Sequence, residues 1–305
     1  MQTHLPYLPF AEYHFSYKAV DAIKIPPFPG RLLHGAFGSA LKANVCAFPD
    51  NKPRDTFCEV CEIKKQCAYT NIFKRHYLDQ KSTGLQETPS SPFIFKYHQQ
   101  CFLQYPQNCI FSLKLLIIGQ ANLQIDYVID AMKSLGERGI SQKKSELVSI
   151  KQVRVGGLDV TINTTNDHRA IFQPEIPASP ELVTIHFITP YNMNSKAMKK
   201  PFDISYWLMG IVRRLSRLQY TYGTQAFTTD FTELKMLCDQ VIASDSLLYF
   251  YETAQTRKSQ SSGILGSIVI SLQGAEKLWP WLYLGQWFHN GKKTSNGNGR
   301  YSLSV

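Results

Sequence analysis

The sequence predicts an α+β fold in which the order strand–helix–strand–strand–helix–strand occurs twice. Three observations predict it. The length of 305 residues favours two ordinary domains over one. Segments with apolar residues at alternate positions, typical of strands, are interleaved with segments in which apolar residues recur every three or four positions, typical of helices. Pro174, Pro177 and Pro180 mark a linker, after which the same order starts again.

The first unit, residues 1–173, is expected to begin with a strand and a helix, in which Leu33 to Leu41 supply a buried stripe. Asn122 is the expected N-cap of the unit's second helix, and Gly136 or Gly139 its expected end. The expected elements, in order, are strand 11–20, helix 31–42, strands 93–103 and 109–118 as a hairpin, helix 122–138, and strands 147–155 and 158–162.

The second unit, residues 174–305, repeats this order. Its expected elements are strand 182–189, a long helix 202–222, a helical segment 232–243, strands 247–257 and 264–272, helix 276–288 and a last strand at 301–303. This order is the one found in ferredoxin-like domains, so we predict two such domains in tandem. A cysteine-rich insertion, at about residues 44–80, interrupts the first.

Composition points to a polyanionic partner. The net charge is +10, from 33 Lys and Arg against 23 Asp and Glu, and aromatic residues make up 12%. Basic and aromatic side chains together suit RNA, whose phosphates they pair with and whose bases they stack on. The N-terminus has no signal-peptide pattern and no segment is long and apolar enough to span a bilayer. We therefore expect a cytoplasmic protein that binds no membrane.

Four of the seven cysteines gather in the insertion: Cys46, Cys58, Cys61 and Cys67. Four thiolates at this spacing can close a tetrahedral zinc site that would hold the insertion together, and His76 could replace one of them. Free reduced thiols are the alternative that the sequence leaves open.

A basic stripe lies along the first expected helix. On a helical wheel, Arg31, His34, Gly38 and Lys42 fall on the side opposite the buried stripe. Such a stripe, with a glycine in it, can lie flat on a phosphate backbone. An ordinary solvated helix face is the alternative.

The C-terminal residues 289–305 form a second basic feature. Three glycines, Gly291, Gly297 and Gly299, lie among three cations, Lys292, Lys293 and Arg300. Glycines allow close approach of the backbone to a ligand, and successive free N–H groups form concave anion sites. This stretch therefore predicts a phosphate cradle, with a flexible basic loop as the alternative.

Several of these segments together resemble the CRISPR-associated endoribonucleases of the RAMP superfamily that process precursor CRISPR RNA. That family carries a Gly-x-x-x-Arg/His-Gly-x-Phe-Gly-x-x-Leu segment on its first helix, which residues 30–41 match with His34 in the basic position. Its cysteine cluster continues with Cys-x-Tyr and then Phe, as in Cys67, Tyr69 and Phe73.

The C-terminus extends the resemblance. The family pattern His-x-Gly-Lys-x-Thr, followed by Gly-x-Gly-x-Tyr, is matched in register from His289 to Tyr301. An intermediate Arg-Tyr-Ser of the family appears here as Arg257-Lys-Ser, without the aromatic residue, and a following Gly-Gly-x-x-Gly is reduced to Ser262-Gly-Ile-Leu-Gly266. The resemblance spans nearly the whole chain.

The resemblance implies cleavage of a CRISPR repeat hairpin without a catalytic cofactor. The 2′-hydroxyl beside the scissile phosphate would attack in line, leaving a 2′,3′-cyclic phosphate and a 5′-hydroxyl. This chemistry needs a base, an acid and cations that stabilise the developing charge. We expect His34 as general acid or base, Lys42 on the same stripe as the cation that stabilises the transition state, and Arg31 as its companion. His289 is the expected second histidine, with packing or a phosphate contact beside the glycine-rich residues as its alternative. Tyr17 is a further acid or base candidate, with a packed strand aromatic as its alternative.

For RNA binding, the resemblance points to the glycine-rich residues above, and the sequence adds a basic helix face. The candidates are Arg31, Arg213, Arg214, Arg217, Arg257, Gly291, Lys292, Lys293, Gly297, Gly299 and Arg300. Other proteins of a CRISPR effector complex are further expected partners. Two other functions stay open: a RAMP subunit that binds RNA without cutting it, and a zinc-stabilised interaction module built on the cysteine cluster.

Overall fold

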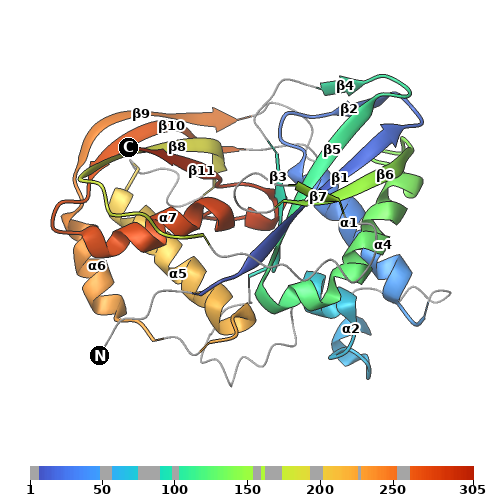
Figure 1. Cartoon of the computed structure of the whole chain (residues 1–305), viewed down its shortest axis with the longest axis horizontal. Coiled ribbons are helices and arrows are strands. Elements are labelled where there is room, and N and C mark those ends of the chain that lie inside the picture. The colour runs from blue at the N-terminus through green and yellow to red at the C-terminus, as the bar shows by residue number, and fades with distance from the viewer. Residues whose placement is uncertain are drawn as a thin grey trace.

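The computed structural model describes residues 7–48, 57–74, 90–97, 103–153, 159–161, 174–192, 202–225, 228–252 and 262–305. Within these ranges the chain forms two halves that lie side by side, each a sheet with helices against it (Figure 1). The strand pairs of both sheets are antiparallel. The α+β class is confirmed.

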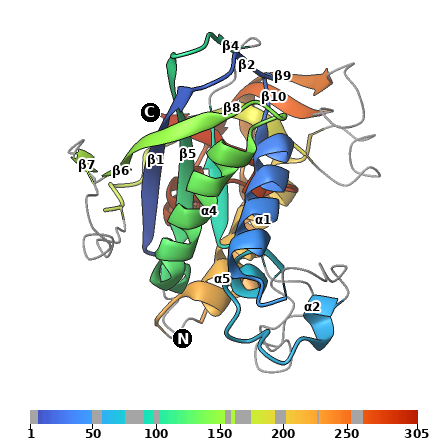
Figure 2. The same ribbon diagram turned by 90° about the vertical axis from the view of Figure 1, so that its right-hand side faces the viewer.

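The first half is a five-stranded sheet in the order β3-β5-β1-β6-β7. Helices α1 (Gly30–Val45) and α4 (Ile125–Arg138) lie next to each other against one face of it (Figure 2). Alternate residues of β1, including Tyr13, Phe15 and Tyr17, are buried in the core that contains these helices. The strands are β1 (Phe10–Ala19), β3 (Phe93–Lys96), β5 (Ile110–Ile118), β6 (Ser145–Val153) and β7 (Asp159–Thr161).

The predicted strand 93–103 is wrong as one element. β3 ends at Lys96, and β4 (Leu103–Tyr105) belongs to a separate two-stranded sheet with β2 (Ile23–Ile25). The residues between β3 and β4 lie outside the described part of the chain. Two short helical pieces, α2 (Phe57–Val60) and η1 (Thr70–Lys74), belong to the cysteine-rich region.

The ends of α4 test two sequence predictions. The helix ends at Arg138, and Gly139 follows with a φ of 97° while its N–H donates to the carbonyl of Leu135, as predicted for a terminating glycine. The expected N-cap, Asn122, is wrong. A 3₁₀ turn, η2 (Gly119–Gln124), precedes the helix, and the Asn122 amide instead donates to carbonyls of Ile117 and Gly119.

The second half is a four-stranded sheet in the order β11-β8-β10-β9. Its longest helix, α5, is capped by Asp203, whose carboxylate accepts the N–H of Tyr206. The elements are β8 (Leu182–Tyr191), α5 (Ile204–Tyr222), α6 (Phe231–Gln240), β9 (Ala243–Glu252), β10 (Ser262–Ser271), η5 (Glu276–Leu278), α7 (Trp279–Phe288), η6 (Thr294–Asn296) and β11 (Tyr301–Ser304).

The two halves share apolar contacts. Phe10 of β1 meets Phe288 of α7 edge to face, with 5.4 Å between ring centroids, and Ile94 and Leu116 are buried in the core of the second half. Within the second unit, the indole N–H of Trp279 donates to the carbonyl of Pro177 in the expected linker. The domain boundary at residues 173 and 174 stays a prediction. Among the described residues, no helix is long and apolar enough to cross a membrane.

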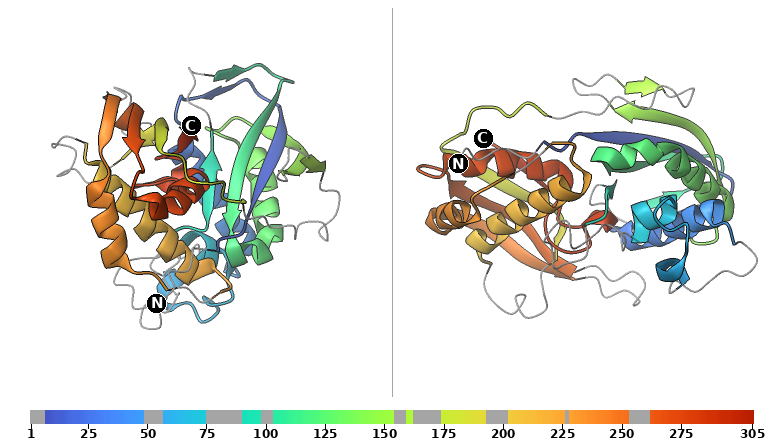
Figure 3. Two further views of the ribbon diagram at one scale, coloured as in Figure 1. Left: turned by 60° about the vertical axis from the view of Figure 1, so that its left-hand side comes forward. Right: turned by 90° about the horizontal axis from the view of Figure 1, so that it is seen from below.

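The chain segment after α7 joins the halves. We name residues 289–300 the C-terminal glycine loop. It leaves α7 in the second half, runs beside α1 and β3 of the first half, and returns to the second sheet as β11 (Figure 3). The two features that the sequence predicted for RNA, the first helix and the C-terminal glycine loop, are therefore neighbours in space.

Candidate nucleic-acid interface

The N-terminus of α1 packs directly on the C-terminal glycine loop. Gly30 has no side chain, and a Cβ there would lie 1.5 Å from the carbonyl oxygen of Asn296. Only glycine permits this approach of two backbones. Arg31 follows and is exposed. His34, which is half-buried, lies about one turn beyond Gly30, about 6 Å along the helix axis at 1.5 Å per residue.

His34 rests against aromatic rings. Its imidazole centroid lies 4.6 Å from that of Phe73 and 5.5 Å from that of Phe93. Lys42 lies about 12 Å beyond His34 along the axis, and its Nζ is 5.6 Å from the ring centroid of Tyr69. Lys42 therefore belongs to the end of the helix that faces the cysteine-rich region, away from the C-terminal glycine loop.

The basic stripe on α1 is only partly a solvent-facing surface. Gly38, predicted on that stripe, is buried, and a Cβ there would lie 2.2 Å from the ring of Phe73. The glycine makes room for a ring of the same protein, so the prediction that it lets a phosphate backbone approach is wrong. Arg31 and His34 remain the accessible basic residues near the C-terminal glycine loop.

The glycines of the loop are explained by close backbone contacts. Gly291, Gly297 and Gly299 have φ values of 91°, 86° and 71°, a region that other residues rarely adopt. A Cβ at Gly297 would lie 2.4 Å from the carbonyl oxygen of Phe95, and one at Gly299 would lie 1.7 Å from that of Asn290.

The N–H groups of these glycines are not free. Gly291 donates to the side-chain oxygen of Asn290. Gly297 donates to the carbonyl of Thr294, and Gly299 to the carbonyl of Pro190. The prediction that these three glycines cradle a phosphate through free N–H groups is therefore wrong. Lys292 and Lys293 remain exposed on the loop, and Lys293 adopts a left-handed conformation with a φ of 57°.

His289 does not lie where it can reach RNA. It ends α7 and is 1% exposed, and its Nδ1 lies 3.3 Å from the carbonyl oxygen of Asn298. Burial lowers the pKa of His289 well below its usual value, and the positive charges of Lys96, Arg300 and Arg214 lower it further. The ring is therefore neutral, and its burial contradicts the expected role as second catalytic histidine.

Tyr17 is also a core residue. It is 0% exposed, its hydroxyl donates to the carbonyl of Met132 at 2.8 Å, and its ring stacks on Phe111. Burial raises the pKa of the hydroxyl far above its usual value. The expected acid or base role is wrong, and the alternative of a packed strand aromatic describes Tyr17.

The basic face predicted on α5 is divided. Arg214 is 7% exposed, and its Nε donates to the carbonyl of Phe288 at 2.7 Å, so it ties α5 to the end of α7 and does not face RNA. Arg213 and Arg217 are half-buried, and the guanidinium of Arg213 lies 5.3 Å from the ring centroid of Tyr206. Arg257 lies outside the described residues.

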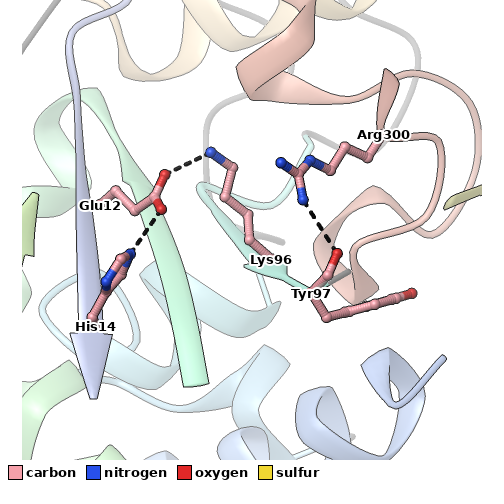
Figure 4. A network of polar contacts seen from close by, with 5 residues as sticks. All are labelled: Glu12, His14, Lys96, Tyr97 and Arg300. Atoms are coloured by element: carbon pink, nitrogen blue, oxygen red, sulfur yellow. Dashed lines mark hydrogen bonds and ion pairs between the residues drawn. The ribbon is translucent and has the colours of Figure 1, made fainter. Parts of the chain in front are cut away.

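A polar network that the sequence reasoning missed joins β1, β3 and the C-terminal glycine loop (Figure 4). The Glu12 carboxylate bonds to Nζ of Lys96 at 2.6 Å and to Nε2 of His14 at 3.0 Å. Arg300 donates to the carbonyl of Tyr97 at 3.3 Å. The only signal in the sequence was a pair of ionisable residues, Glu12 and His14, on one face of a strand otherwise rich in aromatics.

The electrostatics of this network favour the charged pair. Burial alone would raise the pKa of Glu12, but the hydrogen bond from His14 and the charge and hydrogen bond of Lys96 lower it to about 2. Burial lowers the pKa of Lys96, and Glu12 opposes that shift. Glu12 therefore holds a buried ammonium group next to the C-terminal glycine loop.

The four cysteines predicted as zinc ligands lie in the described part of the chain. Cys46, Cys58, Cys61 and Cys67 are free and half-buried, and the described residues contain no group of three or more His, Cys, Asp or Glu side chains that could hold a metal ion. The substitute ligand, His76, lies outside the described residues. A structural zinc stays a prediction, tested by metal analysis of the purified protein.

Two family models together cover most of the chain. One is described as AF_1859_N, N-terminal domain, and matches residues 8–176. The other is the CRISPR-associated endoribonuclease Cas6, and it matches residues 185–301. The chain belongs to the Cas6 family of CRISPR-associated endoribonucleases. The resemblance noted in the sequence is thus confirmed.

Solved Cas6 structures have the same fold. A Cas6 (TTHB231) product complex aligns over 97% of this chain and 100% of its own, with a TM-score of 0.56 and 15% identity. Thermus thermophilus Cas6 (TTHB231) aligns over 98% of this chain and 99% of its own, with a TM-score of 0.54 and 12% identity.

Two further similar proteins are a longer chain and an uncharacterized archaeal protein. A partial Cas6-RT-Cas1–Cas2 complex aligns over 98% of this chain and 47% of its own, with a TM-score of 0.57 and 11% identity. An uncharacterized protein of Archaeoglobus fulgidus is 23% identical over 221 residues, which is 70% of each chain.

Proposed function

We propose that this Cas6-family protein cuts precursor CRISPR RNA within its repeats, without a metal ion. The 2′-hydroxyl attacks the adjacent phosphate and the 5′-oxygen leaves, giving a 2′,3′-cyclic phosphate and a 5′-hydroxyl. The 2′-hydroxyl loses one proton and the leaving 5′-oxygen gains one. The step is therefore balanced and consumes no water. A general base and a general acid accelerate these two transfers.

The accessibility of His34 carries the proposal. Among the predicted catalytic histidines it is the half-exposed one, whereas His289 is buried. It lies one helical turn from the point where α1 meets the C-terminal glycine loop. An imidazole titrates near neutral pH and can serve as base or acid. Arg31, exposed on the turn before, is placed to neutralise the phosphate that His34 acts on.

In this proposal the C-terminal glycine loop binds phosphate through residues 292–295 and not through its three glycines. Lys292 and Lys293 are exposed, and the N–H groups of Lys293, Thr294 and Ser295 have no acceptor among the described residues. Successive N–H groups at a left-handed residue form a concave anion site. The adjacent N-terminus of α1 adds the positive end of its helix dipole.

The substrate in this proposal is an RNA hairpin. An A-form stem is read through its backbone and shape, which suits a surface of cations more than one of base-specific contacts. We also propose that both halves are ferredoxin-like. The first strand of each sheet lies between the two strands that come third and fourth along the chain in that sheet: β1 lies between β5 and β6, and β8 lies between β10 and β11. A cytoplasmic location and association with other CRISPR proteins complete the proposal. A similar protein was solved as part of a Cas6-RT-Cas1–Cas2 complex.

Single-turnover cleavage of a CRISPR repeat hairpin in EDTA tests the proposal. We expect His34→Ala to slow cleavage by about 100-fold or more while RNA affinity stays within about twofold. His186→Ala is the matched control, because His186 lies in β8 of the other half, bonded to Ser304. Cleavage that requires added metal, or His34→Ala at the wild-type rate, would contradict the mechanism.

One observation favours the alternative of an RNA-binding protein that does not cut. With His289 and Tyr17 buried, His34 lacks the second acid or base that the sequence predicted. Tight binding of the repeat hairpin by the wild type, with no cleavage between pH 6 and 9, would support that alternative.

A further inference from the structure

The cysteine-rich segment, defined here as residues 57–74, has no part in the proposed chemistry, yet it contacts the helix that carries His34. Its Phe73 stacks on Tyr69, with 5.4 Å between centroids and 15° between planes. On the other side Phe73 stacks on Phe93 of β3, at 6.0 Å and 15°. The three rings form a continuous stack from the cysteine-rich segment to the first sheet.

The stack lies along one side of α1. His34, Gly38 and Lys42 are spaced four residues apart, and each meets the stack: His34 meets Phe73 and Phe93, Gly38 meets Phe73, and Lys42 lies over Tyr69. Residues at this spacing share a helix face. The ring of Phe73 takes the space that a side chain at position 38 would fill, directly beside the imidazole of His34.

The cysteine-rich segment folds on itself so that these rings face α1. The Thr70 hydroxyl contacts the carbonyls of Cys67, at 2.8 Å, and of Lys64. The amide of Asn71 donates to the carbonyl of Lys65 at 3.2 Å. These bonds close the irregular helical turn Thr70–Lys74, whose Ile72 is buried in the same core as Phe37 and Phe93. The position of Phe73 is thus fixed from both sides.

We propose that Phe73 is a positioning residue for His34, and that the cysteine-rich segment serves the reaction by holding this ring. In this proposal the stack restricts the orientation of the imidazole. Misplacement of a catalytic group by about 1 Å can cost 100-fold in rate. The consequence for the rate rests on the proposed function, whereas the contact between the rings does not.

Phe73→Leu, compared with Phe111→Leu, tests the proposal. Phe111 is buried in the same core and stacks on Tyr17 and Tyr105, remote in contacts from His34, so both variants lose one core ring. We expect Phe73→Leu to slow saturated single-turnover cleavage by about tenfold or more, with RNA affinity within about twofold. Phe111→Leu should keep the wild-type rate at a temperature where both variants are folded.

A spectroscopic readout separates this proposal from the proposed function. In RNA-free protein with labelled histidines, assigned with His34→Ala, the His34 ring protons should show an upfield ring-current shift. That shift should become clearly smaller in Phe73→Leu, in which only Phe93 of the two rings remains, and should be kept in Phe111→Leu. A reduced shift without an effect of His34→Ala on cleavage would contradict the proposed function and leave the positioning intact.

Three results would overturn the positioning role. The first two are an unchanged His34 resonance in Phe73→Leu, and equal rate losses in Phe73→Leu and Phe111→Leu. The third is weaker RNA binding with an unchanged saturated rate, which would make Phe73 an RNA contact.

A second pair of variants displaces the ring without removing it. Gly38→Ala places a methyl group where the Phe73 ring lies, whereas a Cβ at Gly35, on the same helix, meets no atom within 4 Å. We expect the His34 resonance to shift in Gly38→Ala and to stay in place in Gly35→Ala. Equal spectra for the two variants would contradict the proposed stack.

Discussion

Helices α1 and α5 occupy the same place in the two halves, each after the first strand of its unit, yet their polar residues serve different ends. In α5, Arg214, Ser216 and Gln219 are buried, and Arg214 donates to the carbonyl of Phe288 at the end of α7. In α1, Arg31 is exposed and His34 is half-buried beside the C-terminal glycine loop. A basic residue on the first helix of a unit is therefore accessible to a ligand only where no other element covers it.

The largest expected effect comes from the ion pair of Glu12 and Lys96, which joins β1 to β3 beside the C-terminal glycine loop. Glu12→Gln removes the charge that balances the buried ammonium of Lys96. Because an unpaired buried charge is costly, we expect the free energy of unfolding to fall by about 3 kcal/mol, measured by urea denaturation.

An exposed ion pair gives the matched control for Glu12. Asp239→Asn breaks the contact with Lys235 on the surface of α6, where both side chains are about half exposed. Its effect on unfolding should be much smaller, because water screens and solvates such charges. Equal effects for the two variants would mean that Glu12 is not a structural counter-ion.

The next effect compares the two helices directly. Arg214→Met loses the hydrogen bond to the Phe288 carbonyl, and we expect a loss of about 2 kcal/mol in unfolding free energy. Arg31→Met, on α1, should change stability by no more than about 0.5 kcal/mol. RNA binding should respond in the opposite order, with weaker affinity and a shallower salt dependence for Arg31→Met, measured by filter binding at several salt concentrations.

That comparison of helices can fail in a specific way. An Arg214→Met protein that unfolds like the wild type but binds RNA more weakly would place Arg214 in the RNA interface. The division of labour between α1 and α5 would then be wrong.

The smallest effect concerns the pH dependence of stability. The pKa of His289 is lowered in the folded protein, so the unfolded chain takes up a proton there first as the pH falls below about 6.5. The contribution of His289 to the free energy of unfolding is therefore fully present above that pH. Below it, this free energy falls by up to about 1.4 kcal/mol per pH unit. His289→Gln should flatten the decline in stability between pH 6.5 and 5.5, measured by denaturation. An unchanged slope would mean that His289 is not held neutral by burial.

Much of the fold could be predicted because its signals are local. The alternation of β1, the apolar spacing of α1, α4 and α5, and the glycine that ends α4 all depend on residues within a few positions of each other. The failures occurred where a partner from elsewhere decides. The segment after β3 was predicted to continue one strand, but β4 pairs with β2 instead.

The candidate site shows the same division. The spacing of His34 on its helix, the cysteine motif with Phe73 and the glycine-rich ending were visible in the sequence and led to the family. The burial of His289, Tyr17 and Arg214 was not visible. Tyr17 and Arg214 bond to carbonyls more than 70 residues away, and His289 bonds to Asn298 across the C-terminal glycine loop.

The sequence by itself determined the order of elements, the basic and aromatic character and the membership of the Cas6 family, because short-range periodicity and motif spacing encode them. Only the tertiary structure decided what the glycines do. Gly30 and Gly38 look like parts of an RNA-binding stripe, but one meets the backbone of Asn296 and the other the ring of Phe73. A glycine shows that something comes close, and the packing of distant segments decides what that is.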